Sequence, residues 1–240
     1  MKQKTPTVLL FKGSQHSGKT ILCGLFLRML GHLPMLGVDA TAQGDLIRLF
    51  GMQPEQTVQT FLSRCPQQWP LPQQSVDWLL NDLPQPLPQQ AEHELLRWDL
   101  QNLGFELNAQ HQAALQYGLP RLLSQYALTV WDGTIQGIPP GLHNSIDWST
   151  ILVVTPDDER YCQSLANVEH AMVILSQADS TQTLPPSAAA WVQKGQCKYI
   201  GKVPSIPKTA LQSPNAWPKD WLDCFYKLDL PLALLPHTRP

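Results

Sequence analysis

Short runs of consecutive apolar residues recur along the chain, and most of them are closed by a glycine, a proline or an aspartate. Such runs are typical of parallel strands that are covered on both faces. Segments with helical spacing separate them, so the sequence predicts a doubly wound α/β fold with a mostly parallel sheet between two layers of helices. Six strands are expected, at residues 7–11, 35–38, 126–131, 151–155, 171–175 and 199–203.

Helical patterns fill most of the intervening chain. Residues 20–30 are apolar on nearly every face, so this helix should be buried between the sheet and a further layer. A helix is expected at 108–125, with a break near Gly118 and Pro120. Further helices are expected at residues 46–50, 54–64, 89–100 and 219–228.

One stretch departs from this alternation. Between Cys65 and Gln90, six prolines are interleaved with glutamines. Proline has no backbone N–H, so these residues rule out a continuous helix or a central strand. We interpret residues 65–90 as an exposed excursion within one domain that spans residues 1–240, with a partner-binding loop as the alternative.

Composition limits the class of protein. With 240 residues, 43% of them hydrophobic, the chain is able to bury a substantial core. A net charge of -2 gives no overall attraction to nucleic acid or acidic membrane, so any such binding needs a local basic patch. The five cysteines form no CxxC pair, which argues against a zinc site or a disulfide framework. No apolar run approaches the length of a membrane span, and we expect a cytoplasmic protein.

The first predicted strand leads into a loop framed by two glycines. Gly13 to Thr20 fits the phosphate-loop pattern GxxxxGK(S/T), with a strand before it and an apolar helix after it. The glycines let successive amides point into one concavity, to which the start of the helix adds its own N–H groups. Lys19 is expected to reach the β- and γ-phosphates of ATP, and the Thr20 hydroxyl is expected to ligate Mg²⁺. The candidate nucleotide-binding residues of the loop are Gly13, Ser14, Gln15, His16, Ser17, Gly18, Lys19 and Thr20.

Two aspartates close predicted strands and should lie at the same sheet edge as the loop. Asp39 is a candidate to position Mg²⁺ or the attacking water, and helix capping is the alternative. Asp132 is the other candidate for Mg²⁺, with a simple turn aspartate as the alternative. Together with Lys19, they are the candidate catalytic residues. The residues expected near the nucleotide base are Gln177 and Pro204, which follow later strands.

Taken in order, these pieces resemble the ParA/MinD family of ATPases, which carry a deviant form of the phosphate loop. The resemblance covers most of the chain and rests on the loop and on residues 38–39, 43–44, 131–133, 153–157 and 199–204. It implies a homodimer in which two subunits sandwich two ATP molecules. The family has a signature lysine where this chain has Ser14, and often a second aspartate where it has Thr41. In having serine at the signature-lysine position, the chain resembles the carboxysome-positioning members called McdA. Serine cannot supply a charge to the opposite subunit.

The resemblance implies the positioning or partition of a cargo, such as a plasmid, a chromosome or a carboxysome-like body. In such a system ATP favours a dimer that binds nonspecific DNA of the nucleoid, and a cargo-borne adaptor protein stimulates slow hydrolysis. Basic residues in the C-terminal half contact DNA in the family, with a solvated surface as the alternative for each. The candidates here are Lys194, Lys198, Lys202, Lys208 and Lys219.

Three other functions are weighed against this one. A GTPase of the same SIMIBI superclass would recognise guanine with the aspartate of an NKxD element, which residues 176–179 resemble without its asparagine and lysine. A biosynthetic ligase of related fold would need substrate-binding motifs that we do not find. A binding module whose ATP site regulates assembly with little turnover is favoured by Ser14.

Overall fold

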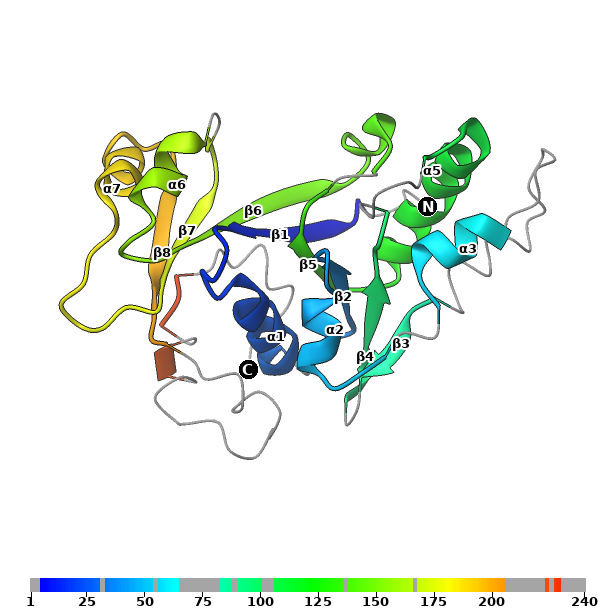
Figure 1. Ribbon diagram of the computed structural model, residues 1–240, viewed down its shortest axis with the longest axis horizontal. Coiled ribbons are helices and arrows are strands. Elements are labelled where there is room, and N and C mark those ends of the chain that lie inside the picture. Colours follow the sequence, from blue (N-terminus) through cyan, green and yellow to red (C-terminus); the bar gives the residue numbers. More distant parts are fainter. Residues whose placement is uncertain are drawn as a thin grey trace.

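The computed structural model describes residues 5–30, 33–53, 56–64, 83–87, 90–100, 106–135, 138–165, 168–205, 223–224 and 227–229. Within these residues, eight strands form one sheet with the order β3-β4-β2-β5-β1-β6-β7-β8 (Figure 1). Neighbouring strands are parallel, except that β3 and β4 are antiparallel. The strands are β1 (Thr7–Gly13), β2 (Met35–Ala40), β3 (Gln85–Leu87), β4 (Gln90–Arg97), β5 (Leu128–Gly133), β6 (Asp147–Val154), β7 (Met172–Ser176) and β8 (Lys198–Val203).

One face of the sheet is covered by α1 (Lys19–Met29) and α2 (Asp45–Leu49), below the strands in Figure 1. The buried side of α1 packs against Phe11, and the two aromatic rings Phe11 and Phe26 meet edge to face with centroids 5.1 Å apart. Residues 22–27 of α1 are all buried, in agreement with the apolar sequence, because the helix packs on the sheet and against α2, which lies beside it on the same face.

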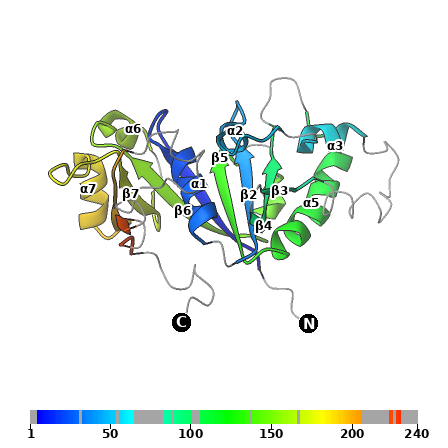
Figure 2. The same cartoon turned by 90° about the horizontal axis from the view of Figure 1, so that it is seen from below.

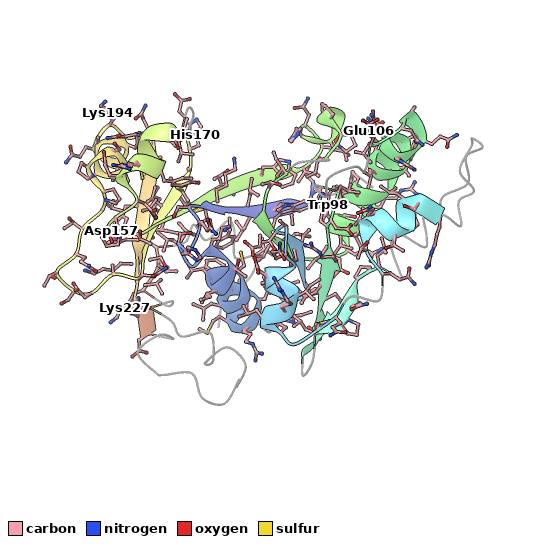
Figure 3. The ribbon with its side chains drawn as sticks, in the orientation of Figure 1. Trp98, Glu106, Asp157, His170, Lys194 and Lys227 are labelled. Atoms are coloured by element: carbon pink, nitrogen blue, oxygen red, sulfur yellow. The ribbon has the colours of Figure 1, made fainter. Side chains whose placement is uncertain are left out.

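The opposite face is covered by α3 (Val58–Arg64), α5 (Ala109–Ser124), the short 3₁₀ helix η1 (Pro140–Leu142), α6 (Glu159–Ser164) and α7 (Pro186–Gln193). Alternation along β6 places α6 and α7 on this face: Ile151 points towards α1, so Leu152 points the other way, where it packs with α6 and α7. Trp98, labelled in Figure 3, and Trp131 pack in the core under α5 with ring centroids 5.0 Å apart. Helices on both faces of a mostly parallel sheet confirm the predicted doubly wound α/β fold.

The carboxyl ends of the parallel strands share one edge, as the arrows of β2, β5 and β6 show in Figure 2. β1 is a central strand, between β5 and β6. Strands β2 to β5 lie on one side of it, and the later strands β6 to β8 lie on the other side. A reversal of strand order of this kind opens a crevice beyond the strand ends, and ligands of doubly wound folds bind there. The loop after β1 begins at this point.

The helix predicted at 89–100 is wrong, because residues 90–97 form β4. The apolar residues of this stretch fit helical spacing, but β4 pairs with β2 in parallel and with β3 in antiparallel. Leu95 is buried on the α1 face and Leu96 on the α5 face, which a strand achieves with consecutive residues. Pairing with two neighbours therefore overrides the local pattern.

The proline-rich excursion expected at 65–90 is only partly described, since residues 65–82 and 88–89 lie outside the described residues. Its last part is only partly exposed: Leu83 and Leu87 are buried and Pro86 is exposed, and residues 85–87 form β3 at the edge of the sheet. Pro86 lies within this edge strand, which is where a residue without a backbone N–H is tolerated.

The predicted break at Gly118 and Pro120 is also wrong, because α5 runs without interruption from Ala109 to Ser124. Leu115, Leu119 and other apolar residues of the helix are buried against the sheet, and this packing offsets the hydrogen bond that Pro120 cannot donate. Of the helix expected at 219–228, residues 223–224 are helical, and most of the remainder lies outside the described residues.

Candidate nucleotide-binding site

The loop from Gly13 to Thr20 connects the end of β1 to the start of α1 at the crevice. Gly13 has no room for a side chain, because an added Cβ would lie 2.4 Å from Ser17 Oγ and 2.7 Å from the Val153 carbonyl oxygen. The turn therefore closes tightly over the end of β6. Gly18, in the left-handed conformation, is the N-cap of α1 and leaves the helix without a side-chain cap. The first-turn N–H groups are in this way available to an anion.

A cleft of about 690 Å³ opens beside this loop, within the usual size range of small-molecule sites. Three parts of the chain line it: the phosphate loop with the start of α1, the segment around α2, and the ends of β7 and β8. Its lining residues are Gln15, His16, Gly18, Lys19, Thr20, Ile21, Leu22, Gln43, Asp45, Arg48, Leu49, Ser176, Gln177, Pro204 and Ser205. Of the residues predicted from the sequence, Gln177 and Pro204 thus come together with Lys19 and Thr20. Gly13, Ser14, Ser17, Asp39 and Asp132 are not among the lining residues.

Asp132 lies at the end of β5 and is completely buried. Within the described part of the chain no donor makes a hydrogen bond of normal geometry to its carboxylate oxygens, and the Thr20 hydroxyl is a donor that lies nearby. Burial raises the pKa of this carboxyl from 3.8 to about 7, the nearby Thr20 hydroxyl and Lys19 lower it, and Asp39 and Asp45 raise it. An unpartnered buried carboxylate is costly unless a cation or a proton compensates it. The oxygens of Asp132 and Thr20 are the hard ligands that Mg²⁺ prefers, so the residues fit this metal.

Gly133 follows Asp132 and brings two strand ends into backbone contact. An added Cβ would lie 2.4 Å from the Ala40 carbonyl oxygen, and the φ angle of 115° is one that other residues rarely adopt. Asp132 and Asp39 are direct neighbours in the register of β5 and β2. The ends of these two strands therefore form one packed unit beside the phosphate loop.

Asp39 holds the first turn of α2 from β2, although the N-cap residue of this helix is Gly44. Oδ1 accepts hydrogen bonds from the backbone N–H of Thr41 (3.0 Å) and from its hydroxyl (2.7 Å), and Oδ2 accepts one from the backbone N–H of Ile47 (2.9 Å) in the first turn of α2. The carboxylate is fully buried and forms an ion pair with Arg97 at 3.2 Å. A metal-binding or water-orienting role for Asp39 stays a prediction, and it would require this ion pair to open.

Arg97, at the end of β4, was missed by the sequence analysis. Its guanidinium donates to the carbonyl oxygens of Asp39 (3.0 Å), Thr41 (2.6 Å) and Ala42 (3.2 Å) in addition to the Asp39 carboxylate. Five donors in a planar fork make arginine suited to holding several carbonyls at once. Arg97 thus fixes the segment that leads from β2 into α2. Recognising 90–97 as a strand would have placed this residue at the functional edge of the sheet.

Four residues at the ends of β7 and β8 line the cleft: Ser176, Gln177, Pro204 and Ser205. The side-chain amide of Gln177 donates to the carbonyl oxygen of His16, so the end of β7 is tied to the phosphate loop. Asp179 is exposed and lies outside the cleft lining. Its Oδ1 accepts hydrogen bonds from Thr181 N–H, the Thr181 hydroxyl and Gln182 N–H, which hold its pKa below the ordinary value.

The described residues contain neither a cluster of metal-binding side chains nor a helix that could cross a membrane. No group of three or more histidine, cysteine, aspartate or glutamate side chains in this part of the chain is arranged to hold a metal ion. None of the described helices has both the length and the apolar character needed to cross a bilayer.

Comparison with known proteins identifies the fold. No family model matches the sequence, and no curated protein is significantly similar to it. Among solved structures, MinD of Aquifex aeolicus is 14% identical, with a TM-score of 0.63 and 98% of both chains covered. A plasmid partition protein of Borrelia burgdorferi bound to AMPPNP is 12% identical, with a TM-score of 0.59, 96% of this chain and 98% of that chain covered. An ATP complex of McdA from Cyanothece is 15% identical, with a TM-score of 0.58 and 88% of both chains covered. The fold is thus of the ParA/MinD type, as the sequence resemblance predicted.

Proposed function

We propose that the protein is an ATP-dependent dimerising ATPase that positions or partitions an intracellular cargo. The observation that supports this most is the cleft itself: the phosphate loop places Lys19 and Thr20 in it, and the unpartnered carboxylate of Asp132 lies nearby. Structures of the same fold include a plasmid partition protein bound to AMPPNP and McdA bound to ATP.

Each part of the site has a role in this proposal. The loop amides and the first turn of α1 bind the phosphates, and Lys19 neutralises the β- and γ-phosphates. Thr20 and Asp132 hold Mg²⁺, which supplies positive charge to the phosphates when bound. Gln177 and Pro204 border the end of the cleft that receives the base. Hydrolysis of ATP to ADP and phosphate is slow without a stimulating adaptor, since Ser14 carries no charge.

Dimerisation would couple this site to DNA. We propose that two subunits close on two ATP molecules and that lysines of the C-terminal half contact phosphates of nonspecific DNA. Figure 3 shows Lys194, next to α7, and Lys227 well apart on one flank of the molecule. Lys198 pairs with Asp229 at 2.9 Å, and Lys202 donates to the carbonyl oxygens of Asp179 and Ser180. Lys208 and Lys219 lie outside the described residues.

The proposal is tested by assembly and DNA binding. With Mg²⁺ and a nonhydrolysable ATP analogue, the protein should double its mass in light scattering and bind random-sequence DNA, and ADP should support neither. DNA affinity should fall roughly tenfold or more between about 50 and 200 mM salt, because phosphate contacts release counterions. Lys194→Glu should weaken this binding, and Arg121→Glu on the exposed side of α5 serves as the matched control. DNA binding that depends on neither ATP nor salt would contradict the proposal.

Nucleotide specificity separates an ATPase from a GTPase. Asp179, the residue that would read guanine, is engaged in its own turn and does not line the cleft. We therefore expect ATP to displace a fluorescent ATP analogue at concentrations at least tenfold lower than GTP does, which corresponds to about 1.4 kcal/mol or more. Competition titrations measure this directly. Equal or stronger competition by GTP would favour the GTPase, and Asp179→Ala would then be the variant to compare.

A second function of another class is a binding module whose nucleotide regulates assembly without turnover. It is favoured by Ser14 and by the ion pair that occupies Asp39. Phosphate release, measured with and without DNA, distinguishes the two functions, because the binding module assembles on ATP and releases no phosphate above the Lys19→Ala background.

A further inference from the structure

The charges around the cleft are unevenly distributed. Apart from His16, the ionisable side chains that line it are Lys19, Asp45 and Arg48. Asp45 and Arg48 form an ion pair with each other, at 2.9 Å between Arg48 Nη2 and Asp45 Oδ1. Among the described residues that line the cleft, Lys19 is then the cation that is not ion-paired with another lining residue. A triphosphate retains roughly two negative charges after one Mg²⁺ is bound. Ser14, on the loop, adds no charge.

The position of Arg48 is fixed by the helix that carries it. The hydroxyl of Thr41 accepts from Asp45 N–H at 2.8 Å and Asp39 accepts from Ile47 N–H, so the first turn of α2 is held from β2. α2 also packs closely on α1, since a Cβ added at Gly24 would lie 2.7 Å from Leu49 Cδ2. The backbone of Arg48 is therefore held at the wall of the same cleft that Lys19 and Thr20 line, while its exposed side chain can change direction.

The ion pair that holds this side chain is weak. The side chains of Arg48 and Asp45 are 59% and 50% exposed, and a single nitrogen of the guanidinium contacts the carboxylate. Exposed pairs of this kind contribute little, because water screens the charges and two flexible side chains must be ordered. Phosphate oxygens carry more charge than one carboxylate and accept two parallel hydrogen bonds from a guanidinium. A bound triphosphate would thus compete successfully with Asp45.

We propose that Arg48 exchanges its ion pair with Asp45 for the phosphates of the bound nucleotide, and so provides from within the same chain a positive charge that Ser14 cannot provide. Without nucleotide, Arg48 neutralises the carboxylate of Asp45. With nucleotide bound, it neutralises charge on the phosphates. This inference rests on the proposed function, since it requires the cleft to bind ATP.

The test compares ATP, ADP and AMP binding by calorimetry in Arg48→Ala, Arg48→Lys, Asp45→Ala and the wild type. Arg48→Ala should weaken ATP binding roughly tenfold and leave AMP binding within about twofold, because a charged hydrogen bond to the outer phosphates is lost. Arg48→Lys should recover part of the affinity, since it keeps the charge without the planar fork. Asp45→Ala should tighten ATP binding about two- to threefold, because it removes the competing carboxylate.

Two controls separate the possible failures. Arg121→Ala removes an exposed arginine from α5, on the other face of the sheet, and should bind ATP as the wild type does. If Arg48→Ala binds ATP within twofold of the wild type while Lys19→Ala does not, the inference is overturned and the proposed function stands. An equal loss of AMP and ATP affinity in Arg48→Ala would also overturn it, because Arg48 would then shape the wall of the cleft. A wild type that binds no ATP overturns both.

Discussion

Lys19→Ala is expected to weaken ATP binding on the order of 100-fold, the largest effect of any single substitution considered for this protein. Lys19 begins α1, lines the cleft and is the phosphate loop's own cation. Truncating one partner of a desolvated charge pair costs about 2–5 kcal/mol, and about 1.4 kcal/mol corresponds to a factor of ten. Calorimetric titration of the wild type and the variant with ATP and Mg²⁺ measures the loss.

Lys12→Ala is the matched control for this substitution. Lys12 lies on β1 just before the loop, is exposed, and is not among the residues that line the cleft. The variant should bind ATP within about twofold of the wild type, as is usual for the removal of an exposed charge. If Lys19→Ala binds ATP as tightly as the wild type, the assignment of the loop as the phosphate site is wrong.

Asp132→Asn is expected to lower the rate of Mg²⁺-dependent phosphate release about 10- to 100-fold, the range found when a metal-supporting group is removed. It should also change how stability depends on pH. The pKa of Asp132 is raised from 3.8 to about 7 in the folded protein, so the folded state holds the proton more tightly than the unfolded state does. Without metal, the free energy of unfolding therefore falls as pH rises between these two values, by about 2–3 kcal/mol from pH 5 to pH 8 relative to the variant.

Urea unfolding at several pH values, with and without Mg²⁺ and ATP, measures this difference. Mg²⁺ binds the ionised carboxylate, so the stabilisation by Mg²⁺ and ATP should be larger at pH 8 than at pH 6 in the wild type and nearly independent of pH in Asp132→Asn. Asp147 is an exposed carboxylate at the start of β6, far from the carboxyl-end edge of the sheet. Asp147→Asn is therefore the control and should behave as the wild type. Parallel pH profiles for the wild type and Asp132→Asn would show that Asp132 does not titrate in this range.

The strand, loop and helix around residues 13–20 were predictable from the sequence because the information for this conformation is local. The apolar run of β1, the two glycines and the apolar helix follow one another within about twenty residues, and each has a direct conformational meaning. The six predicted strands correspond to observed strands for the same reason, since a buried parallel strand is a continuous apolar run. The doubly wound fold followed from their alternation with helices.

What escaped prediction depends on contacts between distant parts of the chain. β4 has a sequence compatible with a helix, and pairing with β2 and β3 decides its conformation. Arg97 could not be linked to Asp39, 58 residues earlier, until this pairing was known. Arg48 and Asp45 have the spacing of an ordinary exposed pair on a helix, and only the cleft reveals that they face the phosphate loop.

The backbone contact between Gly133 and Ala40 couples the ends of β5 and β2 mechanically. Asp132 precedes Gly133, and Ala40 precedes the segment that Arg97 clamps and that carries Arg48. With no space for even one extra carbon between them, the end of β5 cannot shift towards β2 unless Ala40 and the segment behind it shift as well. A shift of Asp132 when a cation binds or leaves would therefore move α2 through main-chain atoms.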